Sequence, residues 1–170
     1  MLNDIECNAF IELARPTLTP TKPGQVTNPY GRLVQPRSYL TTALDDENPF
    51  IAAMNYRFGR YLNYPLTNPT TPWRVLKYIP GDRFPPHMDR HFMPPVGDER
   101  WLTTLILYLN DVTAGGATVF PRADLTILPK KGHALVFGSA SNGKEDPMAL
   151  HAGADILEGE KWIVAKWFIR

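Results

Sequence analysis

The second half of the chain is dominated by short runs of β-forming residues with only turns between them. Residues 73–79 alternate in polarity (WRVLKYI), residues 101–109 are almost continuously apolar (WLTTLILYL), and residues 161–169 read KWIVAKWFI. Shorter runs, ATVF, LTIL and HALVF, lie between the last two. No helical periodicity separates these seven or eight segments, so we predict antiparallel sheets. The pattern indicates a mainly β fold, a double-sheeted jelly roll with helices packed on one face.

Two helices are expected before these strands. Residues 3–15 (NDIECNAFIELAR) predict a helix with Asn3 and Glu6 forming a capping box. Its apolar stripe would comprise Ile5, Ala9, Phe10 and Ile11 or Leu13. Residues 49–62 predict a second helix, because proline is well accepted at the first helical position. Its apolar face would carry Ile51, Met54, Phe58 and Leu62.

The segment between the helices is rich in proline. Residues 16–36 contain five of the 17 prolines of the chain and are predicted to form a long loop. Two interpretations stay open for this loop, an exposed connector or a lid over a site, with Tyr30 and Arg32 as its large groups. The β-branched and aromatic residues of the following segment, residues 37–43, predict a strand.

Composition narrows the function classes. With 170 residues the chain is expected to form one domain, residues 1–170. A net charge of +1 gives no electrostatic basis for binding nucleic acid or an anionic membrane. The sequence contains no signal peptide pattern and no run of about 18 apolar residues. The single cysteine, Cys7, is expected to be a buried small residue and suits a reducing compartment, so we expect a cytoplasmic protein.

A possible metal site comes from residues 78–89 (YIPGDRFPPHMD), a segment too rich in proline to be a helix. In an extended segment residues two apart point to the same side, so His87 and Asp89 can bind one ion together. His151 is the candidate third ligand. Two histidines and one carboxylate are the ligand set of non-haem Fe(II) oxygenases.

The other two histidines are weaker candidates. His91 is a rival ligand, because it forms a D-x-H pair with Asp89. His133 stands at the start of a strand and is interpreted as a residue at the rim of the fold.

Lys161 opens the last strand and strengthens the metal hypothesis. It shares one strand face with Ile163, Ala165 and Trp167, and an ammonium group is costly to bury without a partner. A bound dicarboxylate would supply the missing negative charge. The alternative is that the opposite face points inward and Lys161 lies in solvent; Lys166 weakens this alternative, because it would then point inward itself.

Four blocks in this order resemble the prolyl 4-hydroxylase branch of the 2-oxoglutarate/Fe(II)-dependent oxygenases. They are residues 78–89, residues 108–121 (YLNDVTAGGATVFP), residues 130–137 (KKGHALVF) and residues 151–169. The resemblance covers about the last hundred residues. It implies a double-stranded β-helix core and an enzyme that uses 2-oxoglutarate and O2 to hydroxylate peptidyl proline, releasing succinate and CO2.

The resemblance also implies roles for single residues. Fe(II) would be held by His87, Asp89 and His151, and Lys161 would pair with the C5 carboxylate of 2-oxoglutarate. Further candidates for the co-substrate pocket and its substrate side are Tyr78, Thr118, Tyr108 and Trp167. Ascorbate would keep the iron reduced, and the partner would be a proline-containing peptide or protein.

Two alternatives remain at this point. The same chemistry can act on another substrate, such as a lysyl residue or a free amino acid. The chain can also be an inactive β-sandwich binding module, although every expected ligand position is filled.

Overall fold

The fold is described from a computed structural model of the chain. It covers residues 1–21, 26–27, 33–34, 39–65, 71–89, 101–141 and 144–169. Tyr30, Arg32, residues 37–38 and His91 lie outside the described residues, so the two interpretations of the long loop and the rival role of His91 stay predictions.

The strands form two main antiparallel sheets. The larger sheet contains, in spatial order, β1 (Thr19–Pro20), β4 (Leu40–Ala43), β5 (Arg74–Tyr78), β15 (Lys161–Ile169), β7 (Trp101–Tyr108), β11 (Ala134–Ser141) and β12 (Lys144–Glu145). The smaller sheet contains β10 (Leu125–Ile127), β9 (Thr118–Phe120), β13 (His151–Gly153) and β6 (Phe84–His87). Two short pairs join β14 (Ile156–Glu158) to β8 (Ala114–Gly115) and β2 (Val26–Thr27) to β3 (Leu33–Val34). The predicted jelly roll with antiparallel pairing is confirmed.

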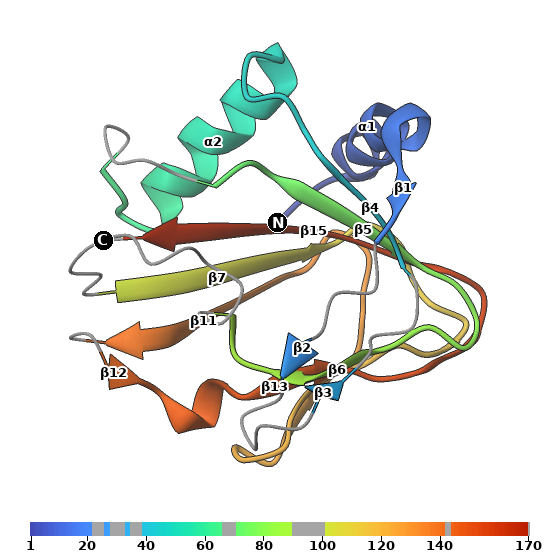
Figure 1. Ribbon diagram of the computed structural model, residues 1–170. Helices are drawn as coiled ribbons and strands as arrows, with labels where there is room; N and C mark the ends of the chain where they lie inside the picture. The colour runs from blue at the N-terminus through green and yellow to red at the C-terminus, as the bar shows by residue number, and fades with distance from the viewer. Residues whose placement is uncertain are drawn as a thin grey trace.

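Both predicted helices pack on the outer face of the larger sheet. α1 (Asp4–Ala14) and α2 (Pro49–Tyr61) lie on one side of this sheet, and the smaller sheet lies on the other (Figure 1). Among the described residues, neither helix is long and apolar enough to cross a membrane.

Local sequence signals determine where α1 begins. The side chain of Asn3 accepts a hydrogen bond from the backbone N–H of Glu6, and Glu6 accepts one from the backbone N–H of Asn3, as the predicted capping box requires. The predicted apolar stripe is confirmed for Phe10, which is buried, and Ile11 and Leu13 pack against the core, but it is wrong for Ile5, which is 79% exposed. The buried face carries Cys7, Phe10 and Ala14. Contact with the larger sheet determines which face of α1 is buried, and these three side chains pack against the core under the helix. Cys7 is fully buried, as expected.

The start of α2 also follows the sequence. Asn48 caps the helix by accepting hydrogen bonds from the backbone N–H groups of Phe50 and Ile51, and Pro49 occupies the first turn. The expected face of Ile51, Met54 and Phe58 is buried against the sheet.

The larger sheet separates two apolar regions. Trp73, Val75 and Val164 face the helices, whereas Leu76 and Ile163 face the interior between the two sheets. Because both faces are covered, the central strand β15 is almost continuously apolar. The interior between the sheets holds the candidate site.

Candidate metal and co-substrate site

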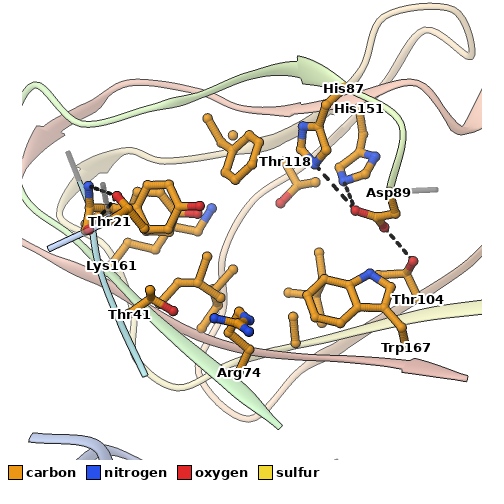
Figure 2. A pocket seen from close by; sticks show the side chains of 18 of the residues that line it. Thr21, Thr41, Arg74, His87, Asp89, Thr104, Thr118, His151, Lys161 and Trp167 are labelled. Carbon is orange, nitrogen blue, oxygen red and sulfur yellow. Dashed lines mark hydrogen bonds and ion pairs between the residues drawn. The ribbon is translucent and has the colours of Figure 1, made fainter. Parts of the chain in front are cut away.

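A cavity of about 400 Å³ lies between the two sheets. Figure 2 shows the side chains that project into it from both layers. Its lining comprises Thr21, Tyr39, Thr41, Thr71, Pro72, Arg74, Leu76, Tyr78, Phe84, His87, Asp89, Thr104, Ile106, Thr118, His151, Gly153, Lys161, Ile163, Ala165 and Trp167. Most of this surface is apolar, with a few ionisable groups at separate places, as in enzyme pockets.

Strand pairing brings two distant histidines together. His87 ends β6 and His151 begins β13, and the two residues are direct partners in the antiparallel register. Their ring centroids lie 4.1 Å apart, and both side chains are buried. The pairing of β6 with β13 thus brings together two histidines that are 64 positions apart in the sequence.

Each histidine is held in one tautomer by a backbone carbonyl. Nδ1 of His87 lies 2.8 Å from the carbonyl oxygen of Pro85, and Nδ1 of His151 lies 3.0 Å from that of Ala149. A carbonyl oxygen only accepts, so each Nδ1 carries the proton and donates it. In a neutral ring with this tautomer Nε2 carries the lone pair, which is the arrangement found in metal-ligating histidines.

Asp89 completes the group with one oxygen facing the histidines. Its Oδ1 lies 3.5 Å from Nε2 of His87 and 3.7 Å from Nε2 of His151. Its Oδ2 accepts a hydrogen bond of 2.5 Å from the hydroxyl of Thr104, which fixes the carboxylate. Burial opposes ionisation of Asp89, but its contacts with His87, His151 and Thr104 outweigh this effect and lower its pKa to about 2.

The three ligand atoms fit a divalent metal. They lie within 4.8 Å of one another and come from two imidazoles and one carboxylate. Burial lowers the pKa of His151 to about 4, so its ring is neutral at physiological pH and its Nε2 is free to bind. This donor set suits a non-haem Fe(II) site with open coordination positions.

The double proline before His87 lies on a sheet edge. In the described part of the smaller sheet β6 is the outermost strand, beside β13. Proline has no N–H to give to a ladder, and edge strands tolerate it for that reason. Pro85 also provides the carbonyl that orients His87.

Lys161 lies inside the cavity, away from the metal ligands. Its side chain is 3% exposed, and Nζ donates a hydrogen bond of 2.6 Å to the carbonyl oxygen of Gly116. Burial lowers its pKa to about 8. No carboxylate pairs with it among the described residues, and Asp89 is the only carboxylate in the described lining.

The other predicted pocket residues surround Lys161. Nζ of Lys161 lies 5.7 Å from the ring centroids of both Tyr78 and Tyr108. The hydroxyl of Tyr108 is hydrogen-bonded to that of Thr118 at 2.8 Å, so Tyr108 supports Thr118 from outside the lining. Gly116 has a φ of +71°, and a Cβ there would lie 3.4 Å from Lys161, which favours glycine.

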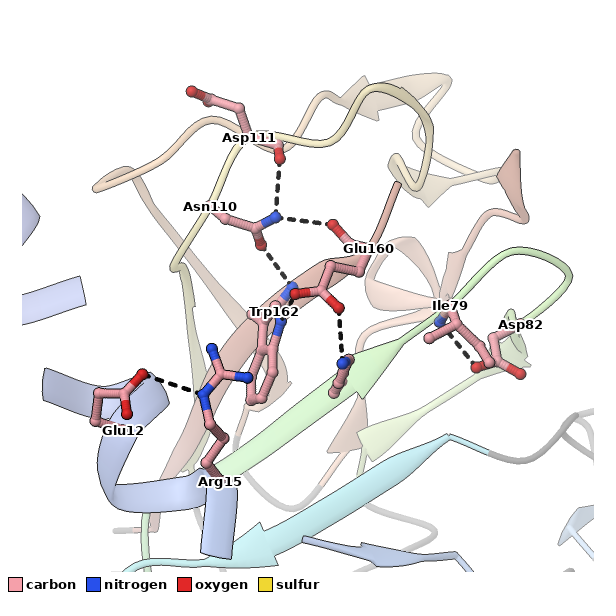
Figure 3. Close-up of polar contacts among 9 residues, drawn as sticks. Glu12, Arg15, Ile79, Asp82, Asn110, Asp111, Glu160 and Trp162 are labelled. Atoms are coloured by element: carbon pink, nitrogen blue, oxygen red, sulfur yellow. Dashed lines mark hydrogen bonds and ion pairs between the residues drawn. The ribbon is translucent and has the colours of Figure 1, made fainter. Parts of the chain in front are cut away.

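Asn110 holds the backbone on both sides of Lys161. Its Nδ2 donates to the carbonyl oxygen of Glu160, and its Oδ1 accepts from the backbone N–H of Trp162 (Figure 3). The carboxylate of Glu160 accepts from Nε1 of Trp162 and pairs with Lys77 at 2.7 Å. This network fixes the start of β15, and with it the position of Lys161.

The opposite face of β15 is buried as well, which corrects the choice posed by the sequence. Lys161, Ile163, Ala165 and Trp167 line the cavity, and Lys166 is fully buried on the helix side. Nζ of Lys166 donates to the carbonyl oxygen of Thr71 at 2.7 Å and lies 5.2 Å from the ring centroid of Trp73. Both alternatives drawn from the sequence assumed that only one face of this strand is buried, whereas both faces are buried.

Several lining residues were not identified from the sequence. Thr104 holds Asp89, Tyr39 packs at 5.1 Å on the ring of Tyr78, and Arg74 projects into the cavity. Strand alternation places Arg74 on the same face as Tyr78, but nothing in the sequence shows that this face lines a cavity. His133 is exposed, as predicted.

Comparison with known proteins adds a family. A model described as the 2OG-Fe(II) oxygenase superfamily matches residues 73–169. Prolyl 4-hydroxylase 2 of Arabidopsis thaliana is 29% identical over 98% of this chain, and prolyl 4-hydroxylase subunit alpha-2 of Gallus gallus is 36% identical over 92%. A solved structure of viral collagen prolyl hydroxylase from Paramecium Bursaria Chlorella virus-1, in a 2OG complex, is 26% identical, with a TM-score of 0.76 over 99% of this chain and 90% of that one.

The matched relatives are longer than this chain. It spans 64% of the Arabidopsis protein and 29% of the chicken subunit.

Proposed function

Because the chain belongs to the 2OG-Fe(II) oxygenase superfamily, we propose that it hydroxylates proline in peptides, with Fe(II), 2-oxoglutarate and O2, and releases succinate and CO2. The observation that carries this proposal is the convergence of His87, Asp89 and His151 in a cavity that also contains the buried Lys161. The similarity to several prolyl 4-hydroxylases supports proline as the target.

In this proposal the triad holds the iron on one side only. Nε2 of His87, Nε2 of His151 and Oδ1 of Asp89 would be the protein ligands, and the carbonyls of Pro85 and Ala149 keep both rings in the required tautomer. When bound, Fe(II) supplies the oxidative chemistry that couples decarboxylation of 2-oxoglutarate to hydroxylation of the substrate. Thr104 keeps the carboxylate of Asp89 oriented and ionised.

The protein's second task is to orient the co-substrate. Lys161 would pair with the C5 carboxylate of 2-oxoglutarate, and this charge would favour the protonated lysine despite its burial. Tyr78 and Thr118 line the same part of the cavity and offer hydroxyl groups to the same ligand. Burial raises the pKa of Tyr78 well above its ordinary value, so its hydroxyl remains a donor.

The substrate would enter on the side of Trp167, near Thr104 and Asp89 (Figure 2). The ring of Tyr39 lies 5.1 Å from that of Tyr78 and 5.5 Å from that of Phe84, and the ring of Phe84 lies 4.0 Å from that of His87. Aromatic surfaces of this kind bind proline-rich segments in several recognition modules. Ascorbate would serve as the reductant.

Mass spectrometry of proline-containing peptides tests this function. After incubation with Fe(II), 2-oxoglutarate and ascorbate, we expect a mass increase of one oxygen that tandem fragmentation places on proline. Formation of succinate without oxygen insertion at proline would favour the alternative substrates, a lysyl residue or a free amino acid. Absence of both products, with iron bound, would favour the inactive binding module.

A further inference from the structure

We propose that Arg74 selects substrates that carry a carboxylate close to the target residue, an inference that rests on the proposed function. Arg74 lies on β5, opposite Ala165 of β15, with its side chain on the cavity side of the sheet. Figure 2 shows its guanidinium projecting between Thr41 and Trp167. It is more exposed than Lys161, as expected for a group at the entrance of the cavity.

The guanidinium of Arg74 has no partner within the described part of the chain. No hydrogen bond or ion pair joins its side chain to another described residue, whereas Arg83 pairs with Asp155 and Arg57 with Glu6. It lies near Tyr39. Burial raises the pKa of Tyr39, and the positive charge of Arg74 offsets part of this rise. A planar group with five donors and no acceptor bound to it among the described residues is suited to bind a carboxylate from outside the chain.

Charge balance in the loaded cavity favours the same conclusion. The two positive charges of Fe(II) and the one of Lys161 equal the two negative charges of 2-oxoglutarate and the one of Asp89. Arg74 is then the one uncompensated charge among the described lining residues. A substrate with one negative group near its reacting residue would neutralise it.

Trp167 adds a second donor to the cavity, on the side of Asp89 and Thr104 (Figure 2). Its indole Nε1 is buried and has no hydrogen-bond partner among the described residues. Buried donors without acceptors are rare in folded proteins, because each costs free energy. Acceptor oxygens of a bound ligand would satisfy this N–H, which again favours an oxygen-rich group over an amine.

The carboxylate has two possible sources, an acidic side chain next to the target proline and the terminal carboxylate of a peptide. Four matched peptides separate them: one proline-containing sequence with glutamate or glutamine beside the proline, each with a free or an amidated C-terminus. A fifth peptide carries lysine at the glutamate position. Binding is measured by calorimetry with 2-oxoglutarate and Mn(II), which fills the metal site without turnover, and hydroxylation is scored separately.

The wild-type protein is expected to bind a carboxylate-bearing peptide about tenfold more tightly than its neutral counterpart, and the difference should shrink as salt is added. Arg74→Gln should abolish the difference, and Arg74→Glu should prefer the lysine peptide. Arg83→Gln is the matched control, because Arg83 is exposed and does not line the cavity. A preference for glutamate identifies the side chain as the source, and a preference for the free C-terminus identifies the terminus.

The proposal is overturned if Arg74→Gln retains the preference, or if the wild type binds all of these peptides equally or not at all. A rise in the KM for 2-oxoglutarate in Arg74→Gln would also overturn it, since Arg74 would then serve the co-substrate. Binding that depends on Arg74 but leads to no oxygen insertion at proline would count against the proposed function alone.

Discussion

At the scale of single residues, the site depends on neighbouring groups that fix the tautomers of its histidines and the orientation of its carboxylate. Two backbone carbonyls set the tautomers of His87 and His151, and one hydroxyl, that of Thr104, turns Asp89 toward them. Only the spacing of His87 and Asp89 can be seen in the sequence. The carbonyls of Pro85 and Ala149 lie two positions before their histidines, and Thr104 lies 15 positions after Asp89, but no sequence pattern shows that these groups make the contacts.

Replacing His87 or His151 with alanine is expected to abolish consumption of 2-oxoglutarate and to leave the fold intact. Each substitution removes one of three metal ligands, and the remaining pair cannot hold the ion in a productive position. Succinate release and iron content after gel filtration provide the measurement, with circular dichroism to check folding. His133→Ala is the control, because His133 is exposed. Full turnover by either ligand variant would rule out the iron assignment.

Lys161→Ala is expected to raise the KM for 2-oxoglutarate by about 10- to 100-fold, with a smaller effect on kcat. In the proposed binding mode the lost interaction would be a buried, charge-assisted pair, which typically contributes about 1.5–3 kcal/mol. Lys130→Ala is the matched control, because it removes a lysine that is exposed. An unchanged KM in Lys161→Ala would mean that another group anchors the co-substrate.

At the scale of elements, β15 connects the two buried layers of the molecule. Lys161 is buried on its cavity face and Lys166 on its helix face. Asn110 fixes its first residues, and the carbonyl of Thr71 accepts from Lys166 further along. One strand therefore carries a residue of the candidate site and a lysine buried beneath α2.

Stability of the ligand-free protein should rise between pH 7.5 and pH 9. Burial lowers the pKa of both Lys161 and Lys166 to about 8. In the unfolded chain both lysines keep their protons up to about pH 10.5. The unfolded state thus binds more protons above pH 8, and the free energy of unfolding increases by about 1 kcal/mol per lysine over this interval.

Urea denaturation at the two pH values measures this gain. Lys166→Met should remove about half of it, and Lys130→Met should leave it unchanged. The series stops at pH 9 because the raised pKa values of Cys7 and Tyr78 act in the opposite direction at higher pH. An identical gain in Lys166→Met would show that Lys166 does not contribute.

At the scale of the whole molecule, stability and chemistry are placed on opposite faces of one sheet. The helices cover an apolar core that contains Phe10, Phe58 and Trp73, whereas the site lies between the sheets. We therefore expect that packing under the helices can change without moving the metal-ligating side chains.

Phe10→Ala tests this separation. The ring is fully buried, 4.9 Å from that of Phe50 and 5.5 Å from that of Trp73. Its removal should lower the free energy of unfolding by about 3–5 kcal/mol. The KM for 2-oxoglutarate, measured well below the melting temperature, should stay at the wild-type value. A parallel change in KM would show that the helix layer supports the site directly.

The sequence by itself determined what depends on neighbours along the chain. Asn3 and Pro49 predict the starts of both helices, because caps and prolines act within one turn. Alternation predicts which residues of β5 share a face, and the spacing of His87 and Asp89 suggests one ion. His151 and Lys161 were also candidates from the sequence, and the family resemblance gave each of them a specific role.

Only the tertiary structure decided which faces are covered. Ile5 is exposed and Cys7 buried because the sheet beneath α1 selects the face. Lys166 is buried because helices cover the side of β15 that faces away from the cavity. Thr104 and Arg74 join the site because β7 and β5 both pair with β15, a register between segments far apart in the chain. Such pairings depend on contacts across the whole fold, which local sequence patterns do not contain.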